Sequence, residues 1–111
     1  MMKTINISQH VHNYVGNTYV SVGHTHKFNN VTSTSPNVKG HYHKYYTLTS
    51  IDNNHYHVME GRTQPAVYLS DGRHQHEINA TTSVDGSTPH SHDYYQISGK
   101  DYPFRDSIIK S

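Results

Sequence analysis

Apolar and polar positions alternate along short stretches of this chain, and the same alternation returns six times. Each stretch reads H-x-H-x-Φ-x-x-x-[T/S], where Φ is a bulky apolar or aromatic residue and the last position carries a hydroxyl group. In a strand, residues i, i+2 and i+4 point to one face, so each stretch predicts a strand with two histidines and one apolar side chain facing inward. The Φ residues are Tyr14, Phe28, Tyr45, Met59, Ile78 and Tyr94. The hydroxyl residues are Thr18, Thr32, Thr49, Thr63, Thr82 and Ser98.

The spacing of the histidines argues against a helix at these positions. Around an α-helix, residues i and i+2 diverge by about 200°, so two histidines separated by one residue do not converge there. Turn-forming pairs separate the stretches, among them Gly16-Asn17, Asp71-Gly72 and Asp85-Gly86, and no segment sustains a period of about 3.6 residues. Short strands broken by turns are typical of an all-β fold, and we expect almost no helix.

The six units group into three tandem double units. Ten residues after its first histidine, every odd unit has Val or Ile, whereas the even units have other residues there. The odd-unit residues are Val20, Ile51 and Val84, and the even-unit residues are Thr34, Pro65 and Lys100. This grouping predicts an all-β, short-strand repeat protein in a pseudo-threefold arrangement, either a β-prism or a β-solenoid-like fold.

The double units also predict how the chain is divided. Their first histidines lie 31 residues apart between His10 and His41, and 33 apart between His41 and His74. We expect an HxH repeat domain over 10–99, with a lead-in strand before it and a tail after it. The predicted divisions are 1–9 for the N-terminal lead-in strand, 10–40, 41–73 and 74–99 for the double units, and 100–111 for the C-terminal tail.

Composition shows that such a fold needs more than apolar packing. Val, Ile, Leu and Phe together number only 20 of 111 residues, a share typical of disordered chains when the net charge is high. Here the net charge is only +1 and the chain has ten tyrosines, which favour strands. We therefore expect a folded chain that bound metal, oligomerisation or both must stabilise. The low charge argues against nucleic-acid binding.

Histidine supplies the candidate chemistry, because all twelve histidines belong to His-x-His pairs and the chain has no cysteine. Neutral imidazole suits zinc, copper, nickel and iron. The candidate metal ligands are His10, His12, His24, His26, His41, His43, His55, His57, His74, His76, His90 and His92.

Three arrangements of these ligands are open. Two pairs at a time give three tetrahedral four-His sites, and three pairs at a time give two octahedral six-His sites. In a homotrimer, each pair would meet its own symmetry copies. The threefold repeat favours the six-His scheme, in which odd pairs converge at one level and even pairs at another. The Φ residues would form apolar layers beside the metal layers, and the hydroxyl residues would act as turn or ligand-supporting hydrogen-bond partners.

Catalysis is not expected from this pattern. Catalytic metal sites keep an open coordination position with an acid–base group beside it. The motif here is repeated six times, and no copy is distinguished by extra acids. The dinuclear hydrolase pattern H-x-H-x-D-H also fails, because His92-Asp93 is followed by Tyr94. We expect a protein that is not an enzyme, with no catalytic residues.

The repeats GHTHKF at 23–28, GHYHKY at 40–45 and the stretch Asp85–His92 resemble the YmaF family of histidine-rich repeat proteins from Firmicutes. This resemblance covers about residues 10–99 and implies the repeat architecture but no particular activity. A second, local resemblance links the six pairs to iron-binding tips of phage tail spikes and tail fibres, where three chains each give His-x-His to one octahedral iron. Here a single chain has enough pairs to supply all three strands of a site.

These observations predict a non-enzymatic transition-metal-binding protein whose role is structural or metal-sequestering. The alternative is a subunit of a filament, spore coat or virion whose pairs bind metal between chains, as a trimer or filament. MMKTINISQH has no apolar run of signal-peptide length, and no stretch of the chain is apolar enough to span a bilayer. We therefore expect a cytoplasmic protein with no membrane partner. A spore, extracellular or virion surface reached by a non-Sec route is the alternative location.

Overall fold

The computed structural model describes residues 9–104, and in this range the chain forms strands, turns and loops with no helix. The all-β prediction is therefore confirmed. Residues 9–104 also contain no helix long and apolar enough to cross a membrane. The strands are β1 (Gln9–Val11), β2 (Asn13–Asn17), β3 (Lys27–Val31), β4 (Ser35–Pro36), β5 (Lys44–Leu48), β6 (Val58–Arg62), β7 (Val67–Tyr68), β8 (His74–Gln75), β9 (Glu77–Thr81), β10 (Asp93–Ile97) and β11 (Tyr102–Pro103).

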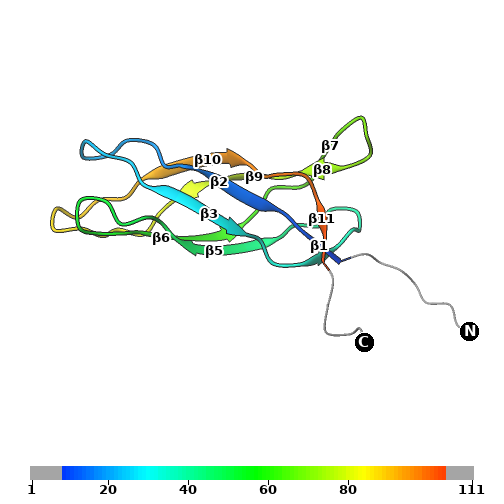
Figure 1. Ribbon diagram of the computed structural model, residues 1–111, viewed down its shortest axis with the longest axis horizontal. Helices are drawn as coiled ribbons and strands as arrows, with labels where there is room; N and C mark the ends of the chain where they lie inside the picture. The colour runs from blue at the N-terminus through cyan, green and yellow to red at the C-terminus, as the bar shows by residue number, and fades with distance from the viewer. Residues whose placement is uncertain (1–8, 105–111) are drawn as a thin grey trace, which may run out of the picture.

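Three antiparallel hairpins of the same design make up most of the molecule. They are β2–β3, β5–β6 and β9–β10, and each pairs five residues with five. The first strand of each hairpin follows an odd His-x-His pair, and the second follows an even pair. The hairpins run along the long axis of the molecule (Figure 1), so the odd pairs lie at one end of the axis and the even pairs at the other.

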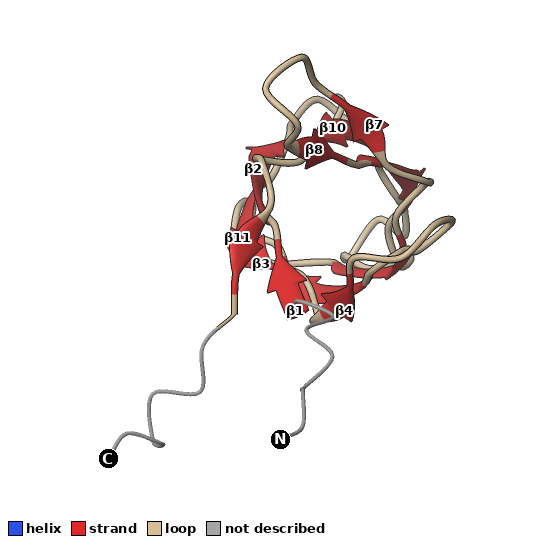
Figure 2. Cartoon of the chain, turned by 90° about the vertical axis from the view of Figure 1, so that its right-hand side faces the viewer, coloured by secondary structure: helices blue, strands red, loops and turns tan. Residues whose placement is uncertain are grey.

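Backbone hydrogen bonds join the three hairpins into a closed ring (Figure 2). In each unit, the residue nine positions after the first histidine donates its N–H to a carbonyl of the neighbouring hairpin. The accepting residue always lies three positions after the first histidine of its own unit. The bonds run from Tyr19 to Asp93, Ser33 to Lys44, Ser50 to Lys27, Gln64 to Glu77, Ser83 to Val58 and Gly99 to Asn13, at 2.8–2.9 Å. The repeat therefore specifies the joints between hairpins as well as the strands.

The Φ residues form the core inside this ring, as predicted: all six are buried and pack together. Large residues face small ones across each hairpin, for example Tyr45 opposite Gly61. A Cβ at Gly61 would lie 3.0 Å from the Tyr45 hydroxyl, and that hydroxyl is hydrogen-bonded to the Tyr94 hydroxyl at 2.7 Å. Glycine at position 61 thus makes room for the tyrosine pair at the centre of a small core.

The two ends of the ring differ. At one end, here called the base, β1 pairs with β4 and β11, and β7 pairs with β8. At the other end, here called the tip, three turns lie side by side at the left of Figure 1. Each turn is closed by an isolated bridge, between Ser21 and His24, Asp52 and His55, and Asp85 and His90.

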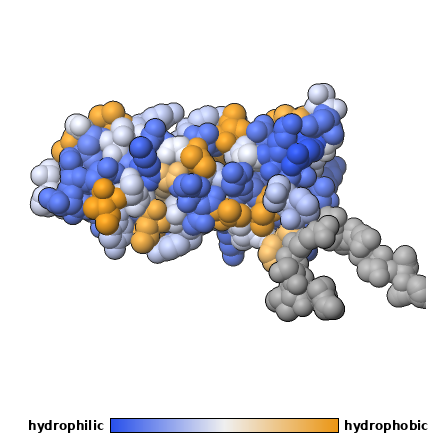
Figure 3. Space-filling model, viewed as in Figure 1, coloured by the Kyte–Doolittle hydropathy of each residue, from blue (hydrophilic) through white to orange (hydrophobic). Residues whose placement is uncertain are grey.

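The outer surface mixes polar and apolar side chains, and the apolar ones are scattered over the face shown in Figure 3. The tyrosines outside the core are exposed, namely Tyr19, Tyr42, Tyr46, Tyr56, Tyr68, Tyr95 and Tyr102. Residues 1–8 of the predicted lead-in strand and 105–111 of the predicted tail lie outside the described residues. The divisions at 10–40, 41–73 and 74–99 stay predictions, as do the finer terms β-prism and β-solenoid.

Candidate metal centre

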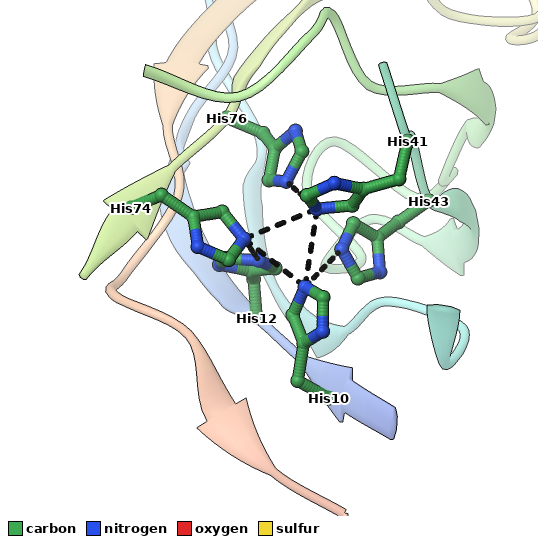
Figure 4. A group of neighbouring side chains, drawn as sticks. All are labelled: His10, His12, His41, His43, His74 and His76. Carbon is green, nitrogen blue, oxygen red and sulfur yellow. Dashed lines mark hydrogen bonds between the residues drawn. The ribbon is translucent and has the colours of Figure 1, made fainter. Parts of the chain in front are cut away.

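The twelve histidines gather into two groups of six, each with ligand nitrogens within 4.8 Å of one another. The odd pairs meet at the base and the even pairs at the tip, which is the grouping that the six-His scheme requires. We call them the base site and the tip site. The base site comprises His10, His12, His41, His43, His74 and His76, and the tip site His24, His26, His55, His57, His90 and His92. Figure 4 shows the base-site rings pointing their Nε2 atoms toward a common centre.

The hydroxyl residue of each unit fixes the backbone of the second histidine in its hairpin partner. In the first hairpin, the Thr32 N–H donates to the His12 carbonyl at 2.9 Å, and the His12 N–H donates to Thr32 Oγ1 at 3.1 Å. The same exchange links Thr18 with His26, Thr49 with His57, Thr63 with His43, Thr82 with His92 and Ser98 with His76. The predicted hydrogen-bonding role of these hydroxyl residues is confirmed.

The Nδ1 atoms are held by backbone carbonyls. For each second histidine, the acceptor is the carbonyl of a residue nine positions after the first histidine of another unit. These are the same residues whose N–H groups join the hairpins, so each joint between hairpins also orients an imidazole ring. These contacts are His12 to Gly99, His26 to Ser50, His43 to Ser33, His57 to Ser83, His76 to Gln64 and His92 to Tyr19, at 2.7–3.0 Å. Among the first histidines, His24, His41, His55 and His90 contact the carbonyls of Val22, Val38, Asn53 and Thr88.

These carbonyls determine the tautomer of the rings. A carbonyl only accepts, so Nδ1 must carry the proton, and in a neutral imidazole Nε2 is then left with a lone pair. Histidine ligands of metal ions are commonly oriented in this way, with one ring nitrogen donating to the protein and the other free to bind. The protein therefore presents its Nε2 atoms to the interior as acceptors.

The Nε2 atoms are spaced like the corners of an octahedron. Six pairs of Nε2 atoms lie 3.0–3.2 Å apart in the base site. In the tip site, four pairs among His24, His26, His55 and His90 lie 3.1–3.3 Å apart. The edge of a regular octahedron is √2 times the centre-to-corner distance, so these edges place a central ion ~2.1–2.3 Å from each nitrogen, close to the length of a metal–imidazole bond.

The six corners of each octahedron form two opposite triangular faces. In the tip site, the Nε2 atoms of His24, His55 and His90 form one triangle with sides of 3.2–3.3 Å. In the base site, those of His10, His41 and His74 form the equivalent triangle, with sides of 3.0–3.2 Å. The first histidines thus make the outer face of each site, and the second histidines, next to the Φ residues, make the inner face.

Facing lone pairs at this distance repel unless a positive charge lies between them. His41 and His76 both give their Nδ1 proton to a carbonyl, yet their Nε2 atoms are 3.2 Å apart. The same holds for His24, His55 and His90 around the outer face of the tip site. In these tautomers the approaches are not hydrogen bonds, and a cation at the centre would turn the repulsion into six favourable contacts.

Burial keeps the second histidines neutral. It lowers the pKa of His12 to about 3 and the pKa of His43 and His76 to about 4, although hydrogen bonds to carbonyls act in the opposite direction. Burial also lowers the pKa of the second histidines His26, His57 and His92, and that of one first histidine, His74. Neutral imidazole is the form that ligates metal, so these rings are ready to bind at neutral pH.

Carboxylates stand behind some of the rings. Asp52 lies 3.4 Å from Nδ1 of His26, Asp85 lies 3.9 Å from Nδ1 of His57, and Asp101 lies 3.5 Å from Nδ1 of His74. A carboxylate behind a ligating imidazole raises its basicity. The sequence pattern did not predict a role for Asp52, Asp85 or Asp101. Asp52 and Asp85 share one place in the repeat, 11 residues after a first histidine, and this shared place could have identified them as residues that support the sites.

Comparison with known proteins gives one family. The family model YmaF, described as "Spore germination protein GerY/YamF", matches residues 7–99. No curated protein and no solved structure matches the chain. The match covers both six-His sites and all three hairpins, so the repeat as a whole is what the chain shares with this family.

Proposed function

This chain belongs to the YmaF family, and from that premise we propose that it is a non-enzymatic protein that binds two transition-metal ions, one in each six-His site. The observation that carries the proposal is the convergence of Nε2 atoms at octahedral spacing in two places. Ten of the twelve rings donate Nδ1 to a carbonyl, which leaves Nε2 to bind an ion.

The coordination number supports a non-catalytic role. When six imidazoles bind one ion, no position is left for a substrate or a reactive water, whereas catalytic metal sites keep one open. The tip-site carboxylates Asp52 and Asp85 lie behind imidazole rings on the Nδ1 side, away from the Nε2 atoms where an acid–base group would have to act.

The same geometry narrows the class of metal. Six nitrogen ligands in an octahedron suit Fe(II), Co(II) and Ni(II), whereas structural zinc is almost always tetrahedral. We therefore propose iron or nickel as the resident ion, with zinc and copper as weaker candidates.

The role proposed for the ions is to hold the ring closed. Each site takes one His-x-His pair from each of the three double units, so one ion fastens all three hairpins together. The apolar core is only six residues, too small to stabilise a domain of this size alone. Because the unfolded chain has no preformed site, the free energy of metal binding becomes free energy of folding.

The family description names spore germination, and we propose that this chain serves the bacterial spore. A fold held by two enclosed ions and without disulfides has no covalent cross-link that a reducing environment could break. This proposal takes up the alternative location stated above, a spore reached by a non-Sec route, in place of the cytoplasm.

Cobalt titration of the metal-free chain tests the metal-binding proposal. We expect two equivalents of Co²⁺ to bind, with the weak visible absorption of octahedral cobalt and a concurrent gain of β-structure in the far-ultraviolet circular dichroism spectrum. His57→Gln should reduce the tightly bound cobalt to one equivalent. Tyr56→Ala, which changes the exposed residue between His55 and His57, should still bind two. Strong tetrahedral absorption, or a β-spectrum unchanged by exhaustive chelation, would contradict the proposal.

A further inference from the structure

The two sites differ in how well they are enclosed. All six base-site histidines are buried, whereas the tip site has three buried histidines, His26, His57 and His92. The three that form its outer face, His24, His55 and His90, are partly exposed. An ion in the tip site therefore has solvent near one triangular face, and an ion in the base site does not.

The backbone that carries two of the three outer-face histidines also differs between the sites, while His41 in the base site bonds to its own turn through Val38. In the base site, His10 lies in β1, which pairs with two other strands, and His74 lies in β8 and exchanges hydrogen bonds with Asp101. In the tip site, His24 exchanges backbone hydrogen bonds with Ser21 at 3.1 and 3.2 Å and donates Nδ1 to Val22. His55 and His90 likewise bond to their own turns. A tip turn and its histidine can therefore swing outward together without breaking a strand pair.

One of the tip turns contains strained backbone, at Val22, that favours such opening. Val22 has φ 50°, and Asn53 and Asn54 have φ 52° and 65°. The left-handed region is unfavourable for a β-branched residue such as valine.

Negative charge is also placed where it would attract an entering cation. Asp52 and Asp85 lie at the tip with 42% of each side chain exposed. The base-site carboxylate, Asp101, is 25% exposed and lies 3.6 Å from Arg73 Nε, which offsets its charge. The tip is therefore the more anionic and the more accessible of the two ends.

From these differences we propose that the tip site exchanges its ion with solution by opening of its three turns, while the base site keeps its ion until the whole ring unfolds. The open tip site would retain the ion on His26, His57 and His92, whose Nδ1 atoms are held by carbonyls of neighbouring hairpins. Three coordination positions would then face solvent for an incoming chelating donor. This inference rests on the proposed function, since it requires an ion in each site.

The test uses the full chain loaded with Co²⁺ and mixed with excess EDTA. We expect two phases of one equivalent each, with rate constants that differ by at least about tenfold, because local opening is more frequent than global unfolding. The fast phase should leave the far-ultraviolet spectrum unchanged, and the slow phase should follow loss of β-structure. His55→Ala should accelerate only the fast phase, while His41→Ala, the equivalent change in the base site of the same double unit, should accelerate only the slow phase.

Hydrogen exchange of the loaded, unmodified chain gives the same information if a variant does not fold. The amides of His24, His55 and His90, bonded within the tip turns at 3.2 Å, should exchange faster than the amide of His74, the equivalent position in the base site, which donates to Asp101. Two ions that leave in a single phase, or a base-site ion that leaves first, would overturn the inference but not the proposed function. Fewer than two bound ions would overturn the proposed function and the inference with it.

Discussion

Replacement of Thr63 by valine tests the hydrogen-bond network that sets the histidines in place. Thr63 is 4% exposed, and its Oγ1 accepts the backbone N–H of His43 at 3.1 Å. Valine has nearly the same shape, so it fills the space but leaves the buried His43 N–H without its acceptor. An unsatisfied buried donor costs about 1–3 kcal/mol, which at about 4–8 °C per kcal/mol lowers Tm by about 4–24 °C.

Thr63→Ser is the matched control. Serine keeps the hydroxyl, as Ser98 does at the equivalent position of the sixth unit, and loses one methyl group worth about 0.8 kcal/mol. The free energy of unfolding should be measured by urea titration at one fixed free concentration of Co²⁺, because bound metal adds to apparent stability. We expect valine to destabilise more than serine. The reasoning is refuted if the valine variant is as stable as the natural chain, or if serine is the more harmful of the two.

Three further predictions follow from the same structure. Burial holds the pKa of His12, His43 and His76 at about 3 to 4, below the ordinary 6.5, so between these values the unfolded state binds more protons than the folded state. The free energy of unfolding should therefore fall as pH drops from about 6.5 toward 4, and urea titrations that show no change over this window would contradict the prediction. Gly61→Ala should cost about 1–3 kcal/mol by pressing on Tyr45, and an unchanged Tm would show that the core yields. Asp52→Asn should slow Co²⁺ uptake at the tip about threefold at low salt and less at high salt, whereas Asp71→Asn, on an exposed carboxylate paired with Lys100, should not.

The repeat made much of the fold and the site predictable because side-chain identity marks every inward position. Extended backbone places residues such as His12 and Tyr14 on one face, and the threefold recurrence of that pattern predicts three pairs at each level, although β2 itself begins at Asn13, just after His12. The structure has this arrangement, with the odd pairs at the base and the even pairs at the tip. The core was predictable for the same reason, since each Φ residue lies two positions after a second histidine.

The contacts that orient the imidazole rings were not predictable, because backbone atoms make them. The carbonyls that accept Nδ1 belong to residues as different as Tyr19, Gln64 and Gly99. A carbonyl is present at every residue, so no residue type marks its position. The two-residue strands β4, β7 and β11 at the base were missed as well, since so short an element has no periodicity to detect.

Native mass spectrometry combined with elemental analysis tests the central claim most directly, because it counts ions per chain and chains per particle together. The account predicts two transition-metal ions on each monomeric chain. Three ions per chain would indicate four-His sites instead. Ions found only on trimers or larger assemblies would show that the pairs of different chains share each site, and either result would contradict the account.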